Sequence, residues 1–199
     1  MSKVNKVRTV CKEFCKSLSV YSLFFVPLQP IMIEVKIKDA DLQLAAKEGM
    51  DAFVGAFVGA IRSAINGELT VENMSELTAD QITLLAWSTL HDEVMDGGFV
   101  QLIYNGYGTF IFKNPFAKAV KLWGLRDLSK LVYEAHTLWL KYRDRIECEL
   151  SDEAFMALFE QMPEFDDLDD AFVENEEDWT ATVAHYIDDH IENFATIER

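Results

Sequence analysis

Histidines and carboxylates near the C-terminus are the residues whose spacing most directly suggests chemistry. His185, Asp188 and Asp189 could share one face of a helix, and Glu192 or Asp92 could join them. Such a set could hold a divalent metal for hydrolysis. None of the four histidines forms the His-Glu-x-x-His motif of a helical zinc protease, however, and histidines beside carboxylates are often surface residues. A metal-dependent hydrolase is one hypothesis, and no other feature of the sequence supports it.

Other catalytic signatures do not occur in the sequence. It holds no phosphate-binding glycine loop, no nucleophile elbow and no dinucleotide fingerprint. The pair Gly97-Gly98 lacks the third glycine and the strand-to-helix setting that those motifs need. The sequence therefore identifies no catalytic residue, no cofactor and no metal ligand, and we expect a protein that is not an enzyme.

The densest chemical feature is an acidic run in which the thirteen residues 166–178 hold eight carboxylates. If wholly helical, the run would span roughly 20 Å with one charge per about 2.5 Å, whereas duplex DNA carries one per about 1.7 Å. Carboxylates on a rigid helix can bind the arginines and lysines that another protein reserves for phosphates. The candidate partner-binding residues are these acids and three that follow them: Asp166, Asp167, Asp169, Asp170, Glu174, Glu176, Glu177, Asp178, Asp188, Asp189 and Glu192.

The formal net charge of −16 lies almost entirely in the C-terminal part of the chain. From Glu147 onward there are eighteen acids against Arg199 alone. Such a field repels nucleic acids and anionic membranes and attracts basic protein surfaces, so we expect neither direct nucleic-acid binding nor a membrane partner. The three cysteines are odd in number and have no metal-ligand spacing, which is typical of reduced thiols in a cytoplasmic protein.

Residues 1–31 differ in character from the rest of the chain. They hold five basic residues against one acid, followed by a short apolar run that ends at Pro27. The run is too short to span a bilayer, and no cleavage pattern typical of a secretory signal follows it. We expect a disordered extension or a translation start at Met32, with a secretory signal as the alternative, and one folded acidic domain over 32–199.

Apolar periodicity predicts an all-α bundle for that domain, preceded by a short strand at 31–38. A capping box at Thr78–Gln81 opens one helix, Asn114-Pro115 opens another, and Ser151 caps a third. Small residues around Gly55 and Gly59 favour close approach of another helix, and we interpret this face as packing either in the core or in a homodimer. The predicted helices cover 40–66, 82 to the glycine pair, 115–124, 127–146, 151–161 and most of the acidic tail from 165.

The glycine pair Gly97-Gly98 interrupts a helical pattern near the middle of the chain. Each glycine costs about 1 kcal/mol against alanine inside a helix, so the pair predicts a bend, a positive φ or a close approach of a neighbouring helix backbone. Gln101 and Asn105 lie four residues apart and could bond each other or a nearby backbone group. We interpret this stretch as a structural joint.

The same stretch resembles the signature of the DNA-mimic protein family, which consists of small bacterial proteins. The resemblance extends from about Leu77 to Glu198, and it includes Trp123-Gly124-Leu125, the acidic segment 165–172 and the closing segment 186–194. At Leu102-Ile103-Tyr104 the chain departs from the aromatic pair that relatives commonly carry. The residues that match the family signature, all interpreted as structural, are Glu93, Gly97, Gly98, Phe99, Gln101 and Asn105.

The resemblance implies an acidic protein that binds the DNA-binding face of a transcription regulator, or of another basic DNA-binding protein, and blocks it from DNA. A general protein-interaction module, such as an immunity or antitoxin-like protein that recognises its partner by shape and apolar contact, is the alternative. Steep salt dependence of binding would favour the first hypothesis, whereas salt-insensitive binding would favour the second.

Overall fold

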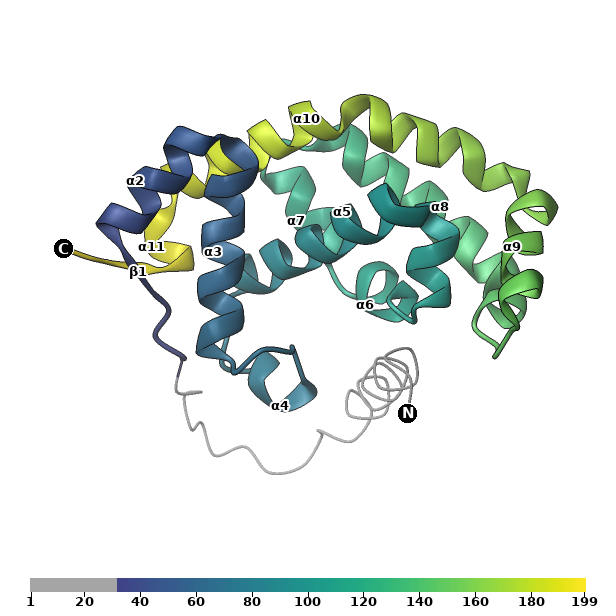
Figure 1. Ribbon diagram of the computed structural model, residues 1–199, viewed down its shortest axis with the longest axis horizontal. Helices are drawn as coiled ribbons and strands as arrows, with labels where there is room; N and C mark the ends of the chain where they lie inside the picture. Colours follow the sequence, from purple (N-terminus) through teal and green to yellow (C-terminus); the bar gives the residue numbers. More distant parts are fainter. Residues whose placement is uncertain (1–31) are drawn as a thin grey trace. The chain divides into compact units, whose positions relative to one another are not determined.

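The computed structural model describes residues 32–199, so the predictions for residues 1–31 lie outside the described residues. Over the described range the chain forms ten α-helices, one short 3-10 turn and two three-residue strands (Figure 1). The predicted all-α class with a short strand is therefore confirmed. None of these helices combines the length and the apolar character that crossing a membrane requires.

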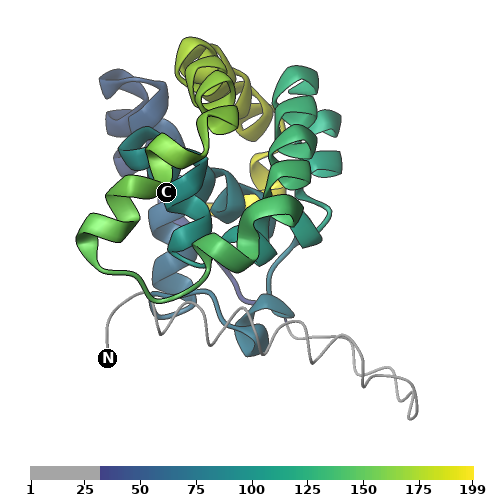
Figure 2. The ribbon, with the colours of Figure 1, turned by 90° about the vertical axis from the view of Figure 1, so that its right-hand side faces the viewer.

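The described chain falls into two compact units. Unit 1 comprises Ala86–Glu177, and unit 2 comprises 32–85 together with Asp178–Arg199. Helix α5 (Ala79–Tyr104) and helix α10 (Asp166–Asp189) each run from one unit into the other. Figure 1 shows α10 lengthwise, and Figure 2 shows it nearly end-on.

A small parallel sheet joins the two chain segments of unit 2. Strand β1 (Lys36–Lys38) pairs with β2 (Thr196–Glu198), and Ile37 lies opposite Ile197. The predicted strand is confirmed over three residues. Its periodicity gave no sign of a partner, because the pairing strand lies at the far end of the sequence.

The single helix predicted over 40–66 is wrong, because Gly49 divides it into α2 (Asp39–Glu48) and α3 (Met50–Ala64). Gly49 has φ 134° and ψ −179°, a conformation that is essentially restricted to glycine. Helix α3 buries Phe57 and Ile61 in unit 2. Gly55 and Gly59 are exposed, and a Cβ built on either would have no atom within 4 Å. The dimer contact expected there stays a prediction.

The start of α5 in unit 2 confirms the predicted capping box. The backbone N–H of Gln81 donates to Thr78 Oγ1 over 3.0 Å, and the Thr78 N–H donates to Gln81 Oε1 over 2.9 Å. Gln81 also donates from Nε2 to the carbonyl of Phe194, at the end of α11 (Ile191–Phe194). The capping residues thus fasten α5 to the C-terminal segment of the same unit. The remaining helix of unit 2 is α4 (Val71–Met74).

Unit 1 surrounds the bend of α5 with helices whose predicted positions are largely confirmed. Ser151 Oγ accepts from the N–H of Ala154 at the start of α9, and Asn114 Oδ1 accepts from the N–H of Phe116 at the start of α7. Fully buried aromatic side chains, including Phe99, Phe116 and Trp139, fill its core. The elements are α6 (Gly108–Lys113), α7 (Phe116–Leu122), α8 (Arg126–Ile146), α9 (Asp152–Gln161), the 3-10 turn η1 (Pro163–Phe165) and the first half of α10.

Candidate protein-interaction face on helix α10

Most acids of α10 lie on one side of the helix. At about 100° per residue, the exposed carboxylates between 166 and 178 fall within an arc of about 120°. The buried Leu168, Phe172 and Trp179 fall on the opposite side. We call the exposed set the acidic stripe: Asp166, Asp167, Asp170, Glu174, Glu177 and Asp178. Asp188 and Asp189 are exposed near the C-terminal end of α10, and Glu192 is exposed on α11; all three belong to unit 2.

The acidic stripe keeps its charge available for a partner. Within residues 32–199, no Lys or Arg lies in ion-pair distance of any stripe carboxylate. Six exposed charges over a helical length of about 18 Å give one per about 3 Å, close to the spacing of about 3.4 Å along one strand of DNA. The stripe can therefore offer an ordered row of acceptors to arginine and lysine side chains.

Asp169 belongs to the predicted acidic set but faces the interior of unit 1. Its Oδ1 accepts from the backbone N–H of Phe99 over 2.8 Å. Burial raises the pKa of Asp169 to about 6, an effect that the Phe99 bond opposes and the neighbouring Asp166 and Asp170 reinforce. This carboxylate holds the bend of α5, and its orientation excludes it from the exposed row.

The Asp169 contact explains the glycine pair. Gly98 has φ 71° and ψ −177°, and a Cβ there would collide with the carboxylate of Asp169. Gly97 has an extended φ of −164°, and a Cβ there would meet only the side chain of Gln101. The predicted bend and positive φ are thus both present, whereas the group that approaches Gly98 is the Asp169 side chain and not a neighbouring backbone; Gly98 is the position that requires glycine.

The signature amides bind carboxylates around this bend. Asn105 Nδ2 donates to Glu93 Oε2 over 2.6 Å, and Gln101 Nε2 donates to Asp96 Oδ2 over 2.6 Å. The expected bond between the two amides does not form, because the bend brings acids of the preceding turns within reach. Phe99 is fully buried. The signature residues therefore lie around the joint.

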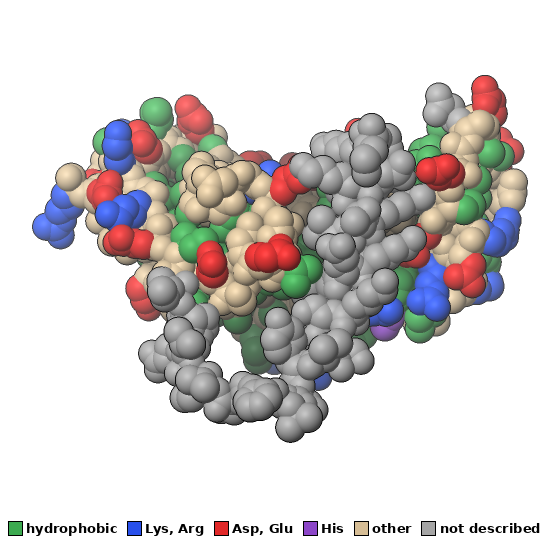
Figure 3. All heavy atoms as spheres, turned by 90° about the horizontal axis from the view of Figure 1, so that it is seen from below, with side chains coloured by type: hydrophobic (Ala, Val, Ile, Leu, Met, Phe, Trp, Pro, Cys, Tyr) green, Lys and Arg blue, Asp and Glu red, His purple; other side chains and the backbone are tan. Residues whose placement is uncertain are grey.

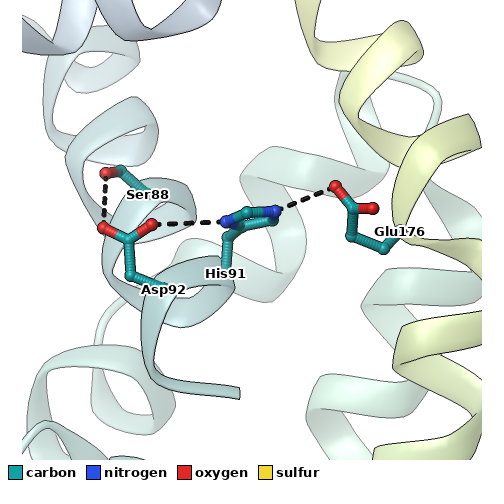
Figure 4. A network of polar contacts seen from close by, with 4 residues as sticks. All are labelled: Ser88, His91, Asp92 and Glu176. Carbon is teal, nitrogen blue, oxygen red and sulfur yellow. Dashed lines mark hydrogen bonds and ion pairs between the residues drawn. The ribbon is translucent and has the colours of Figure 1, made fainter. Parts of the chain in front are cut away.

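Glu176 is the second predicted partner-binding acid that faces inward. Its side chain is only 14% exposed, and its Oε1 lies 2.9 Å from Nε2 of His91. Figure 4 shows His91 between Glu176 and Asp92, with Nδ1 lying 3.3 Å from Asp92 Oδ1. The hydrogen bond to Asp92, and then that to Glu176, raises the pKa of His91, while burial acts to lower it. A protonated His91 would join α5 to α10.

The network in Figure 4 does not have the geometry of a hydrolase triad. Ser88 Oγ lies 3.4 Å from the second oxygen of Asp92, and both nitrogens of His91 contact carboxylates. A nucleophilic serine needs the histidine nitrogen as its base. In this arrangement the histidine instead bridges two acids, which is a structural contact between helices.

The acid content of the run does not reveal the inward contacts of Asp169 and Glu176, although helical register does. Both positions fall on the same side of α10 as Phe172. The Phe172 ring lies against those of Trp87, His91 and Phe99 in unit 1. Charge counting along the run treated all eight acids as equivalent, whereas register separates six outward acids from two inward ones.

The described residues bring together no set of three His, Cys, Asp or Glu side chains that could hold a metal ion. His185 is exposed, and the ring of His190 contacts the carbonyl of Tyr186 and stacks on its side chain. The spacing of His185, Asp188 and Asp189 therefore does not produce a convergent ligand set in this part of the chain.

Comparisons with known proteins assign this arrangement to a family. The family model described as DMP19-like protein matches residues 75–190, a range that begins before the α5 capping box and ends after α10. The chain belongs to the DMP19-like protein family. A curated relative from Neisseria meningitidis serogroup B (strain ATCC BAA-335 / MC58), named DNA mimic protein DMP19, is 37% identical over 127 residues, which cover 63% of this chain and 77% of that protein.

Membership of the DMP19-like family confirms the resemblance inferred from the signature residues. The matched range contains both the glycine bend and the acidic stripe. The family is named for DNA mimicry and not for an enzymatic reaction.

Proposed function

We propose that this protein imitates DNA: its acidic stripe binds the basic DNA-binding face of another protein and blocks that face from DNA. The target is a transcription regulator or a similar DNA-binding protein, and the two meet in the cytoplasm. The observation that carries the proposal is the row of exposed carboxylates on one side of α10, none of them paired with a Lys or Arg of the described residues.

Three further features support the proposal. The spacing of the row is close to that of phosphates along one DNA strand. The stripe lies on a helix whose other side is anchored in the protein core through Phe172, so the charges keep fixed positions. Finally, the curated relative is itself named a DNA mimic. Asp188, Asp189 and Glu192 extend the proposed contact set, whereas Asp169 and Glu176 act from inside as supports.

The first experiment identifies the target and the charge dependence of its binding. The tagged full-length protein captures partners from a lysate of its native cell at low salt, and high salt releases them. A captured DNA-binding protein is then mixed with its labelled duplex, and displacement of the duplex is followed by fluorescence anisotropy. We expect displacement that weakens steeply with salt, because ion release drives the contact as it drives DNA binding.

A matched pair of variants locates the binding surface. D170K/E174K/E177K reverses three stripe charges, and D41K/E48K/D51K reverses three exposed charges of α2 and α3, so both change the net charge equally. We expect the first variant to lose displacement by at least about 100-fold and the second to stay within about threefold of the wild type. Equal behaviour of the two variants would contradict the proposal. Salt-insensitive capture would favour a general interaction module instead.

A further inference from the structure

Basic side chains gather in unit 1, away from the acidic stripe. Residues 113–145 contain eight of the thirteen Lys and Arg residues of 32–199 and only three acids. On α8, at about 100° per residue, the exposed Arg126, Lys130 and Lys141 share an arc of about 100° with Tyr133 and Leu140. Figure 3 shows Lys and Arg side chains, interspersed with Asp and Glu, at the right-hand side, where the α8–α9 end of unit 1 lies.

Part of this surface forms an open hollow of ≈ 470 Å³. Lys121 of α7 and Arg126, Ser129, Lys130 and Tyr133 of α8 line it. We call these residues, together with Leu122 and Leu140, the basic face. Leu122 is 84% exposed, and Tyr133 and Leu140 are each about half exposed. Apolar side chains exposed beside cations match a partner that offers an apolar group among acids.

The acidic stripe offers such an apolar group among its acids. Val173 is 55% exposed and lies, by helical register, beside Asp170, Glu174 and Glu177. Asp170 and Glu174 are four residues apart, as are Arg126 and Lys130, so each pair places its charges about 6 Å apart along its helix. The two surfaces therefore carry opposite charges at similar spacing, and each has apolar side chains among its charges.

Within one chain the two surfaces do not neutralise each other. No stripe carboxylate forms an ion pair with a cation of residues 32–199. Lys130 forms an exposed pair with Asp127 over 2.7 Å, which lowers the pKa of Asp127. Exposed pairs of this kind contribute little and can exchange partners. The cations of the basic face are thus available to a second molecule.

We propose that the basic face of one copy binds the acidic stripe of a second copy, with Val173 seated in the hollow. The contact joins two different surfaces, so it is head-to-tail. Self-association then covers the carboxylates that meet the DNA-binding target, and the two events compete. This competition rests on the function proposed above, whereas the self-association does not.

The test uses charge reversals on the full chain, followed by analytical ultracentrifugation. R126E/K130E reverses the basic face, and E174K/E177K reverses the stripe. We expect the wild type to associate at low salt and to dissociate at high salt, and each variant to associate at least tenfold more weakly. An equimolar mixture of the two variants should associate again, because it pairs an intact stripe with an intact basic face.

A matched control makes an equal change in net charge on another surface. K38E/K47E alters exposed lysines of unit 2 and should associate as the wild type does. The proposal is overturned if the wild type stays monomeric at low salt, if the mixture stays monomeric, or if R126E/K130E associates like the wild type. The last result would place the contact on another surface, such as the glycines of α3.

The target assay separates this inference from the proposed function. R126E/K130E keeps its stripe, so it should displace the duplex from the captured protein at least as well as the wild type does. If no form of the protein displaces the duplex while the mixed variants still associate, the DNA-mimic proposal fails and self-association stands. If displacement occurs without any self-association, the self-association proposal fails and the DNA-mimic proposal stands.

Discussion

Asp169 and Asp170 are consecutive residues with the same side chain, yet they belong to opposite sides of α10. Asp169 binds the Phe99 N–H at the bend of α5, and burial raises its pKa to about 6. Asp170 is exposed in the acidic stripe. The inward side of the helix thus uses acids to hold neighbouring backbone, and the outward side keeps them available for a partner. Helical register, and not acid content, decides which residues can imitate phosphates.

The inward side should be the more sensitive to substitution, and Gly98→Ala should have the largest effect. Alanine would adopt a backbone conformation essentially restricted to glycine and would collide with Asp169. We expect the free energy of unfolding to fall by about 3 kcal/mol. Gly97→Ala, where φ is extended and only the Gln101 side chain must move, should cost less than about 1 kcal/mol. Urea denaturation measures the loss of stability in both variants. Equal losses would contradict the conclusion that Gly98, and not Gly97, requires glycine.

Asp169→Asn sharpens the comparison with its neighbour. The folded state holds the pKa of Asp169 near 6, above its ordinary 3.8, so the unfolded chain releases this proton first as pH rises. The charge therefore lowers stability progressively from about pH 4 to 6, by up to about 3 kcal/mol. The asparagine variant keeps an acceptor for Phe99 and should be more stable than the wild type at pH 7. Denaturation at pH 4.5 and 7 should show a gain in stability over the wild type that is larger at pH 7 for Asp169→Asn, and no such gain for Asp170→Asn.

His91→Gln tests the second inward contact. Asp92 and Glu176 raise the pKa of His91 above its ordinary 6.5, so the contact stabilises the fold below that value and is lost as pH rises through the raised pKa. We expect the variant to lose about 1 kcal/mol at pH 6 and to show a flatter stability profile from pH 6 to 8. His185→Gln, at an exposed position, should keep the wild-type profile.

Neutralising the stripe should have the smallest effect on stability. D170N/E174Q/E177Q removes three exposed charges that have no ion-pair partner among residues 32–199. We expect the free energy of unfolding to change by no more than about 0.5 kcal/mol, and to rise if it changes, because like charges repel. Thermal denaturation at low salt measures it. A loss of several kcal/mol would mean that the outward acids also support the fold.

Sequence patterns predicted the features that depend on local rules. The α8 periodicity, the Ser151 cap and the Thr78–Gln81 capping box are all present within a residue or two. The Gly49 break was missed because small and apolar residues on both sides continue a helical pattern. The pairing of β1 with β2 was missed because it joins segments at opposite ends of the domain, and no local pattern encodes that contact.

For the candidate site, the acidic residues are evident from the sequence, but the directions of their side chains are not. The resemblance identified the glycine joint, and its structural role is visible in the contacts of Gly98 and Asn105. That Asp169 occupies the space beside Gly98 depends on how α10 packs against the bend, which composition does not reveal. Register along α10 would have separated Asp169 and Glu176 from the exposed acids.

The β1–β2 pairing has a consequence for the order in which the protein matures on the ribosome. Unit 2 needs residues from both ends of the described chain, since Phe57 packs against Phe194 and β1 pairs with β2. Its early segments must wait for Phe194 and β2 to be synthesised, whereas the described residues of unit 1 emerge as one continuous stretch. Unit 1 can therefore begin folding before β2 is made, and unit 2 closes only once β2 has emerged.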